Sequence, residues 1–267
     1  MQCRTRAQKA AKKLFEELIA NVAKADQTYN RLGEPWANSD GGRIISTDLA
    51  RFLDERYRAT QPGKPRDLAP SWNGAWRYAQ NRLERELSHR GKREQVRFMA
   101  GGWAAGKTHA LEKLKLVKAD LVWDGTLRDV KWGSRMIEEA LASGWRVEIV
   151  YVHRAIELAI YGAIDRARSE GRGVPLRDLP AVHREVQQTI LELMRRFSAS
   201  PDVAFILLHN TGASDCPGPT IELNYSDLEP GGGLHYAPSH ERYYGAAAEQ
   251  IRKACVRSRH LGKGVCE

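Results

Sequence analysis

The sequence predicts an α/β domain in which a parallel β-sheet lies between layers of helices. Short apolar segments such as "QVRFMA", "ADLVW", "WRVEIVYVH" and "DVAFILLHN" alternate with segments whose apolar residues have helical spacing. Such alternation is typical of a sheet covered on both faces, a three-layer arrangement. The chain has 267 residues, of which 42% are hydrophobic, so it can form one sizeable core.

The first forty residues are predicted to form a helical extension. Over residues 5–25 the apolar side chains share one helical face, and they are Ala7, Ala11, Leu14, Phe15, Leu18, Ile19 and Val22. The segment "NRLGEPWANSDGG" then ends the helix, because it is rich in Gly, Asn, Asp and Pro. We therefore expect an N-terminal helical extension over residues 1–40 and an α/β domain over residues 41–267.

Strands and helices follow in order after residue 40. The strand "RIIST" precedes a helical "LARFLDERYRA", and "PTIELNY" is a weaker strand near the C-terminus. The other expected helices run from Trp76 to His89, Lys107 to Lys118, Trp132 to Ala142, Ile156 to about Ser169, Ala181 to Phe197 and Ser239 to Arg259. Ligands bind at the carboxyl ends of parallel strands. The candidates for function are therefore the glycine turn after residue 100 and Asp48, Asp124, His153 and Asn210.

Composition narrows the classes of partner. The net charge of +9 favours negatively charged partners, but basic and acidic residues are interspersed, and no recognisable nucleic-acid-binding module is present. A dedicated nucleic-acid function is therefore disfavoured. No segment approaches the ~18 consecutive apolar residues of a membrane span, and the first residues lack the apolar centre of a signal peptide. We expect a cytoplasmic protein whose four scattered cysteines form neither a disulfide framework nor a zinc site.

The turn "GGWAAGKT" matches the P-loop pattern G-x-x-x-x-G-K-[ST] and lies between a predicted strand and a predicted helix. In such a loop, backbone N–H groups and the helix N-terminus hold phosphate oxygens. Lys107 is expected to reach the β- and γ-phosphates of ATP, and Thr108 to bind Mg²⁺. The residues expected to contact the nucleotide are Gly101, Gly102, Trp103, Ala104, Ala105, Gly106, Lys107, Thr108 and His109.

The rest of the sequence favours a small kinase over other P-loop classes. A regulatory GTPase would need the guanine-reading sequence N-K-x-D, which is absent. Motor ATPases usually place their second acidic motif further from the loop than Asp124 lies from Thr108. A small kinase closes a basic lid over the transferring phosphoryl group. The lid candidate is "AIDRARSEGRGVPLRD", at about residues 165–180, because arginine holds phosphate oxygens with two N–H groups.

Three segments resemble the zeta toxin family of P-loop kinases, whose known members phosphorylate UDP-N-acetylglucosamine. They are "AGGWAAGKT", "DGTLRDVKWGSRMIEEALASGWRVEIVYVHR" and "ELAIYGAIDRARSEGRGVPLRDLPAVHREV", which together span roughly residues 96 to 210. The resemblance implies ATP and Mg²⁺ as cofactors, a nucleotide sugar as acceptor and an inhibitory antitoxin protein as partner.

The resemblance also implies roles for single residues. Asp124 takes the place of the family's acidic substrate-contacting residue and is a possible Mg²⁺ ligand; Thr126 and Arg128 follow it in the same motif. Arg166 and Arg172 match the two lid arginines, with Arg168 as the fallback. His183 lies where the family has a histidine behind the lid.

One departure from the family concerns the order of elements. Zeta toxins carry a further strand after the P-loop helix, and that strand ends in the aspartate that acts as general base. Here "GRIISTDLARFLDERYRA" looks like this unit, but it precedes the P-loop. A parallel sheet accepts a strand from either side in sequence, so Asp48 is the expected base. Asp124 is the competing candidate, and Ser46, Thr47 or Asp48 could instead cap the helix that follows.

The P-loop pattern predicts a kinase, and the resemblance implies that it depends on Mg²⁺ and ATP and transfers the γ-phosphate to a hydroxyl group of a nucleotide sugar. Three alternatives stay open at this stage. They are a nucleotide-binding protein without turnover, a kinase for another metabolite such as NAD, and a kinase for an RNA end.

Overall fold

The centre of the fold is a six-stranded sheet with the order β3-β5-β4-β6-β7-β8. The computed structural model describes residues 6–34, 37–59, 70–89, 95–113, 119–170, 173–210 and 221–223. The strands are β3 (Ile44–Ile45), β4 (Gln95–Ala100), β5 (Leu121–Asp124), β6 (Arg146–Arg154), β7 (Val203–Asn210) and β8 (Ile221–Leu223). All neighbouring strands are parallel except β7 and β8, which pair antiparallel. The predicted parallel α/β sheet is confirmed.

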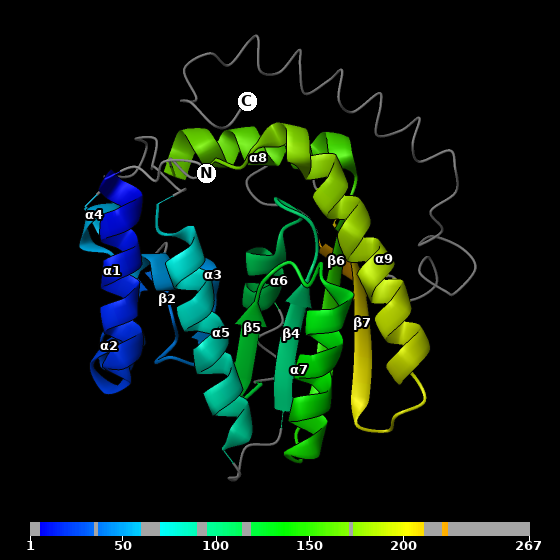
Figure 1. The fold of residues 1–267 in the computed structure, drawn as a ribbon. Coiled ribbons are helices and arrows are strands. Elements are labelled where there is room, and N and C mark those ends of the chain that lie inside the picture. The colour runs from blue at the N-terminus through cyan, green and yellow to red at the C-terminus, as the bar shows by residue number, and fades with distance from the viewer. Residues whose placement is uncertain are drawn as a thin grey trace.

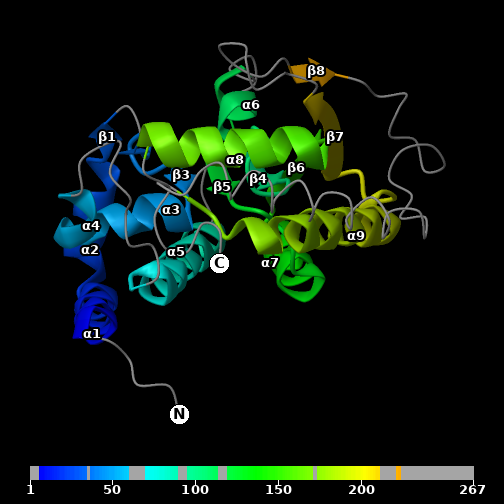
Figure 2. The same ribbon diagram turned by 90° about the horizontal axis from the view of Figure 1, so that it is seen from above.

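Helices cover both faces of this sheet, as Figures 1 and 2 show. One face carries α5 (Trp72–Ser88), α7 (Val130–Ala142) and α9 (Leu179–Phe197), and the other carries α6 (Lys107–Lys113). Helix α8 (Ile156–Glu170) lies across the edge where the parallel strands end. A 3₁₀ turn, η2 (Leu176–Asp178), leads directly into α9. The predicted three-layer arrangement is therefore present, with α8 as an additional element above the strand ends.

The N-terminal part differs from the single predicted helix. It forms α1 (Arg6–Ala20) and α2 (Val22–Asn30), because Asn21 between them has the non-helical backbone angles φ −120° and ψ 68°. A small antiparallel pair, β1 (Gly33–Glu34) with β2 (Ala37–Asn38), follows where only a loop was expected.

The segment after β3 also differs from its prediction. The expected long helix is three short pieces, α3 (Thr47–Ala50), the 3₁₀ turn η1 (Arg51–Leu53) and α4 (Glu55–Arg58). Asp54 interrupts them because its backbone is extended, and its side chain accepts a hydrogen bond from the N–H of Arg56. The helix predicted for residues 239–259 lies outside the described residues.

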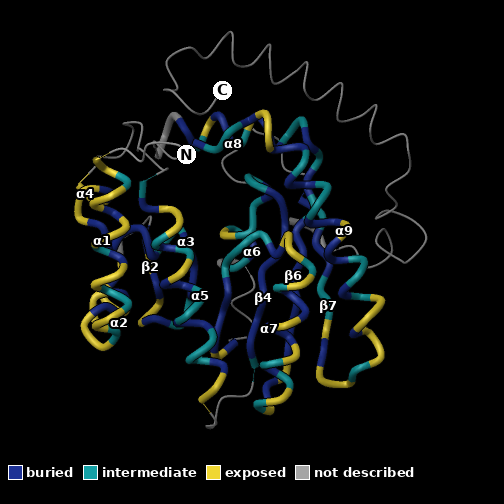
Figure 3. The backbone as a smooth tube through the Cα atoms, viewed as in Figure 1, coloured by how far each residue is buried: buried dark blue, intermediate teal, exposed yellow. Residues whose placement is uncertain are grey.

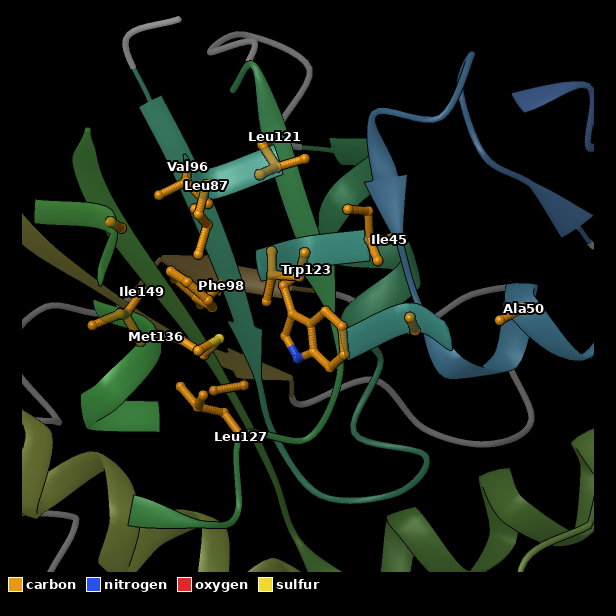
Figure 4. Packing of buried hydrophobic residues seen from close by; sticks show 14 of the residues in the cluster. Ile45, Ala50, Leu87, Val96, Phe98, Leu121, Trp123, Leu127, Met136 and Ile149 are labelled. Atoms are coloured by element: carbon orange, nitrogen blue, oxygen red, sulfur yellow. The ribbon is translucent and has the colours of Figure 1, made fainter. Parts of the chain in front are cut away.

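The main core fills the space between the sheet and helices α5, α7 and α9. Trp123 of β5 is almost fully buried, and its ring contacts Trp76 of α5 and Trp132 of α7, with centroid distances of 5.7 and 5.0 Å. Figure 4 shows Trp123 near Phe98 and Met136, and Figure 3 shows the buried strands between more exposed helices. Because aromatic side chains bury the largest apolar areas, these rings fix the spacing between sheet and helices.

The N-terminal helices share this core. Phe15 of α1 is 1% exposed and lies against Gly74 of α5, where an added Cβ would be 2.4 Å from the Phe15 ring. Tyr29 of α2 is fully buried; its hydroxyl donates to the carbonyl of Ile44 and accepts from the N–H of Ser46, both at 3.0 Å. Burial also raises the pKa of Tyr29, so its hydroxyl stays protonated. Strand β3 is therefore fastened to the N-terminal helices, although the proposed boundary at residue 40 stays a prediction.

Replacing Phe15 with alanine is expected to destabilise the whole domain. The change opens a cavity between α1 and α5, and phenylalanine-to-alanine changes in cores typically cost about 3–5 kcal/mol. Chemical denaturation followed by tryptophan fluorescence measures the loss. Lys13→Ala, at a side chain that is 80% exposed on the same helix, serves as the control and is expected to change stability little. Equal stability of Phe15→Ala and the wild type would show that α1 does not contribute to this core.

Candidate functional site

The glycine turn joins β4 to α6 with the conformation of a phosphate-binding loop. Gly101 and Gly106 have φ angles of +148° and +96°, values that favour glycine. Gly101 also lies against the neighbouring strand, since an added Cβ would be 2.7 Å from the carbonyl oxygen of Val152. Its N–H donates to the carbonyl of Thr126. The turn is therefore held by contacts with β6 and with the segment that follows β5, without help from a ligand.

Three side chains hold three successive carbonyl groups of this turn. His183 Nε2 of α9 donates to Trp103 O at 2.9 Å. Arg154 Nη1, at the end of β6, donates to Ala104 O at 3.0 Å, and Asn210 Nδ2, at the end of β7, donates to Ala105 O at 2.9 Å. With its carbonyl groups held from outside, the turn keeps one conformation in which its N–H groups can serve phosphate oxygens.

His183 is neutral in this arrangement. The side chain is 4% exposed, and burial lowers its pKa to about 4, with nearby cationic groups acting in the same direction. It also lies directly against Gly102, where an added Cβ would be 2.1 Å from its ring. The histidine predicted behind the lid therefore supports the P-loop by hydrogen bonding and by contact.

Lys107 begins α6 and lies at the centre of the charged groups. Its ammonium group donates to the carbonyl groups of Gly101 and Gly102, both at 2.9 Å. Burial lowers the pKa of Lys107 to about 8, and Arg166 acts in the same direction, whereas Asp124 and Asp48 raise it. An anion near this ammonium group would favour its charged form. The geometry therefore suits the negative charge of a phosphate group.

Asp48 lies at the same edge of the sheet, although it comes from a strand that precedes the P-loop. Strand β3 pairs parallel to β5, with Ile45 opposite Trp123, so the residues that follow both strands share one edge. Ser46 provides the helix cap, because its Oγ accepts from the N–H of Asp48. The carboxylate of Asp48 lies 3.5 Å from Arg51 Nη1 and 3.6 Å from Arg166 Nη2. Of the three residues that could cap this helix, Ser46 is therefore the one whose side chain does so. The Asp48 carboxylate faces two guanidinium groups instead.

Asp124 and Arg166 complete this group around Lys107. Asp124 is the last residue of β5, and Arg166 comes from α8, which crosses the strand ends. Both act on the charge of Lys107, together with Asp48. One cation of the P-loop, one cation of α8 and two carboxylates therefore interact at the carboxyl edge.

Other predicted site residues lie differently. Arg128 is half exposed, and its Nη1 lies 3.8 Å from the carboxylate of Glu185 of α9. Thr126 contacts the P-loop through its backbone carbonyl group, which accepts a hydrogen bond from the N–H of Gly101. His153 Nδ1 accepts from Gln187 Nε2 at 2.9 Å, so His153 faces α9. Arg172 and the side chain of Arg168 lie outside the described residues.

The loop's remaining side chains divide between burial and exposure. Trp103 and Ala104 pack against the apolar side chains of α8, and Ala105 is buried under the sheet edge. Thr108 is exposed and His109 is half-buried on α6.

The residues present fit a magnesium ion. Thr108 offers an exposed hydroxyl group at the start of α6, and Asp124 offers a carboxylate at the end of β5. Within the described ranges, no three His, Cys, Asp or Glu side chains are grouped closely enough to bind a metal alone. Mg²⁺ does not need such a group, because it is usually held by one or two protein ligands, substrate phosphates and water.

Sequence reasoning missed the roles of Arg154 and Arg51. Arg154 is 6% exposed and Arg51 is 2% exposed, although arginine is rarely buried without partners. A signal for Arg154 was available, because it ends the apolar segment "WRVEIVYVHR" next to His153. Arg51 carried no such signal, since it lies in a segment that reads as an amphipathic helix.

The zeta toxin family model, described as "Zeta toxin", matches residues 116–213. The matched segment is similar to the zeta toxin family. It includes Asp124, Arg128, Arg166 and His183, whereas the P-loop and Asp48 precede it.

Two solved structures resemble this zeta-toxin-like chain weakly. The native AvrRxo1-ORF1:-ORF2 complex has 16% sequence identity and a TM-score of 0.39, covering 52% of this chain and 60% of that chain. A structure from the PezAT chromosomal toxin-antitoxin system of Streptococcus pneumoniae has 11% identity and a TM-score of 0.33, covering 67% of this chain and 94% of that chain. No protein of curated function matches the sequence. The α/β P-loop fold therefore rests on the sheet order and the P-loop themselves.

Residues 116–213 are thus similar to the zeta toxins, a family of P-loop kinases. Among the residues that the structure describes, every helix is too short or too polar to cross a lipid bilayer.

Binding of ATP at pH 8 is expected to be accompanied by proton uptake. In the free protein Lys107 has a pKa of about 8, and a bound triphosphate raises this pKa because it favours the ammonium form. Roughly half a proton is then taken up per ATP bound at pH 8, and almost none at pH 6. Calorimetry in buffers of different ionisation enthalpy measures this uptake. Lys107→Arg is the control, because arginine is already charged at pH 8; equal uptake in this variant would contradict the assignment.

His183 is expected to weaken the fold as the pH falls. Its pKa is lowered from 6.5 to about 4 on folding, so protonation favours the unfolded chain. The contribution of neutral His183 to the free energy of unfolding is fully present above pH 6.5. It is lost as the pH falls towards 4, and the whole loss amounts to about 3 kcal/mol. Denaturation at several pH values should show a smaller acid loss in His183→Gln, which keeps an N–H donor for Trp103. Parallel pH profiles of the two proteins would argue against a buried neutral histidine.

Proposed function

We propose that the protein is an ATP- and Mg²⁺-dependent kinase that transfers the γ-phosphate of ATP to a hydroxyl group of a nucleotide sugar such as UDP-N-acetylglucosamine. The observation that carries this proposal is the convergence of Asp48, Asp124 and Arg166 on Lys107 at the opening of the P-loop. The proposed activity is cytoplasmic, because its donor is ATP.

The donor side of the proposed site is formed by the P-loop. Its N–H groups and the ammonium group of Lys107 bind the phosphates and stabilise the negative charge that develops on the leaving ADP oxygen. Thr108 and Asp124 are the residues that would hold Mg²⁺, whose positive charge screens the phosphate oxygens. Since His183, Arg154 and Asn210 fix the loop, little rearrangement is needed when the triphosphate binds.

The acceptor side is formed around Asp48. Its carboxylate accepts the proton of the acceptor hydroxyl while that oxygen bonds to the γ-phosphorus, and the bond from this phosphorus to the bridging oxygen of ADP breaks. Asp48 is 41% exposed at its side chain, so an acceptor can reach it. The guanidinium groups of Arg51 and Arg166 lie 3.5 and 3.6 Å from this carboxylate.

Arg166 is the proposed cation of the lid. Helix α8 holds it over the strand ends at 3.6 Å from Asp48, where its guanidinium group can move to the oxygens of the transferring phosphoryl group. Arg172 remains the proposed second lid arginine on the resemblance alone. The acceptor and an inhibitory antitoxin protein are proposed on the family resemblance.

Asp48→Asn is expected to lower kcat by a factor on the order of 10²–10⁴ while ATP affinity stays close to that of the wild type. The reason is that asparagine keeps the shape of the side chain but cannot accept the proton. Transfer from γ-labelled ATP to UDP-N-acetylglucosamine, and to a metabolite extract in parallel, measures the rate. Glu55→Gln is the matched control, because Glu55 is an 88% exposed carboxylate in the same segment.

The same assay separates the two candidate bases. If Asp48→Asn is as fast as the wild type while Asp124→Asn is inactive, Asp48 is not the base. If the wild type binds ATP but labels no acceptor, a nucleotide-binding protein without turnover replaces the kinase.

A further inference from the structure

An exposed tryptophan lies close to the acceptor side of the site. Trp72 begins α5 and is 44% exposed, and only Tyr161 shares this degree of exposure among the large apolar side chains of the described residues. Helix α5 begins at the end of the molecule where the parallel strands terminate (Figure 1). Because burial of an indole ring is strongly favourable, an exposed ring next to a reaction site is a candidate for ligand contact.

Arg51 connects this ring to Asp48. Its guanidinium carbon lies over the Trp72 ring at 5.5 Å from the centroid, and its Nη1 lies 3.5 Å from the Asp48 carboxylate. The Arg51 side chain is only 3% exposed, and its Nε donates to Ser71 Oγ. It also lies over the Tyr57 ring. A buried arginine with these contacts fixes the position of the indole relative to Asp48.

The position of Trp72 separates it from both the transferred phosphate and the reacting hydroxyl. Trp72 is linked to Asp48 at the end of β3, whereas the P-loop follows β4, and β5 lies between these two strands. Arg51 stands between Trp72 and Asp48. A group that contacts Trp72 is therefore a different part of the acceptor from the group that carries the reacting hydroxyl.

We propose that Trp72 is the platform on which the nucleobase of the acceptor stacks, with the reacting hydroxyl of the same molecule at Asp48. This inference rests on the proposed kinase function and names the part of the acceptor that its specificity depends on. A nucleobase offers a planar face to an indole ring, and such stacking contributes substantially to binding without requiring one particular base. The platform explains why an exposed tryptophan is held by Arg51 near the carboxylate that accepts the proton.

The test measures binding and does not depend on turnover. The donor site is first saturated with Mg²⁺ and a non-hydrolysable ATP analogue, and UMP, AMP and N-acetylglucosamine 1-phosphate are then titrated separately by calorimetry. For Trp72→Ala we expect affinity for UMP or AMP to fall roughly 5- to 100-fold. Trp72→Phe should retain most of the affinity, because it keeps an aromatic face. Tyr161→Ala, which removes the other exposed aromatic ring, should leave it unchanged.

Other outcomes overturn the platform without deciding the kinase function. Unchanged nucleotide affinity in Trp72→Ala, no binding of either nucleotide to the wild type, or loss of N-acetylglucosamine 1-phosphate binding alone would each exclude nucleobase stacking at Trp72. Loss of affinity for the ATP analogue alone would assign the ring to the donor. If phosphoryl transfer from γ-labelled ATP continues in any of these cases, the proposed kinase function stands. If the wild type binds UMP through Trp72 but transfers no phosphoryl group, the kinase function is overturned and the stacking role of Trp72 stands.

Discussion

The site depends on how the carbonyl groups of one turn are held. A loop that presents its N–H groups to a phosphate must place its carbonyl groups elsewhere, and buried carbonyl groups need partners. Here His183, Arg154 and Asn210 supply one hydrogen bond each to three successive carbonyl groups. These side chains come from α9, β6 and β7, so the shape of the loop is set by the sheet and by the helix that covers it. Correct folding of the sheet and formation of the anion site are therefore one event.

Opposite charges lie next to one another at the carboxyl edge of the free protein. The ammonium group of Lys107 donates hydrogen bonds to two loop carbonyl groups, and the Asp48 carboxylate lies between the guanidinium groups of Arg51 and Arg166. These contacts keep each charged group close to the place where a substrate would need it. The cost of bringing the groups together is thus met during folding, which is the basis of electrostatic preorganisation.

The sequence predicted the parallel sheet and the P-loop pattern from local patterns, and it predicted Asp48 and Asp124 at one edge from the rule on strand ends. Arg166 was expected near this edge only as part of the lid segment. The sequence did not predict the contacts of Arg154 or Arg51, which depend on elements far apart in the chain. The prediction of one continuous helix after β3 was wrong, because the hydrogen bond between the Asp54 side chain and the N–H of Arg56 interrupts the helix despite the regular apolar spacing. The break at Asn21 was missed for a similar reason: the apolar spacing continues through it, and backbone angles at one residue are weakly encoded.

The two-residue strand β3 brings a segment that precedes the P-loop in sequence to the same edge of the sheet. The proposed phosphate-binding segments, from β4 onward, are continuous in sequence. The Asp48 carboxylate comes from the part of the chain before them, and its strand is fastened at the sheet edge through Tyr29. In the proposed kinase, donor binding and acceptor chemistry therefore come from separate stretches of the sequence. Loss of the upstream stretch would remove the Asp48 carboxylate together with the core contacts of Phe15 and Tyr29, so the proposed base and part of the stability of the domain are encoded in the same segment.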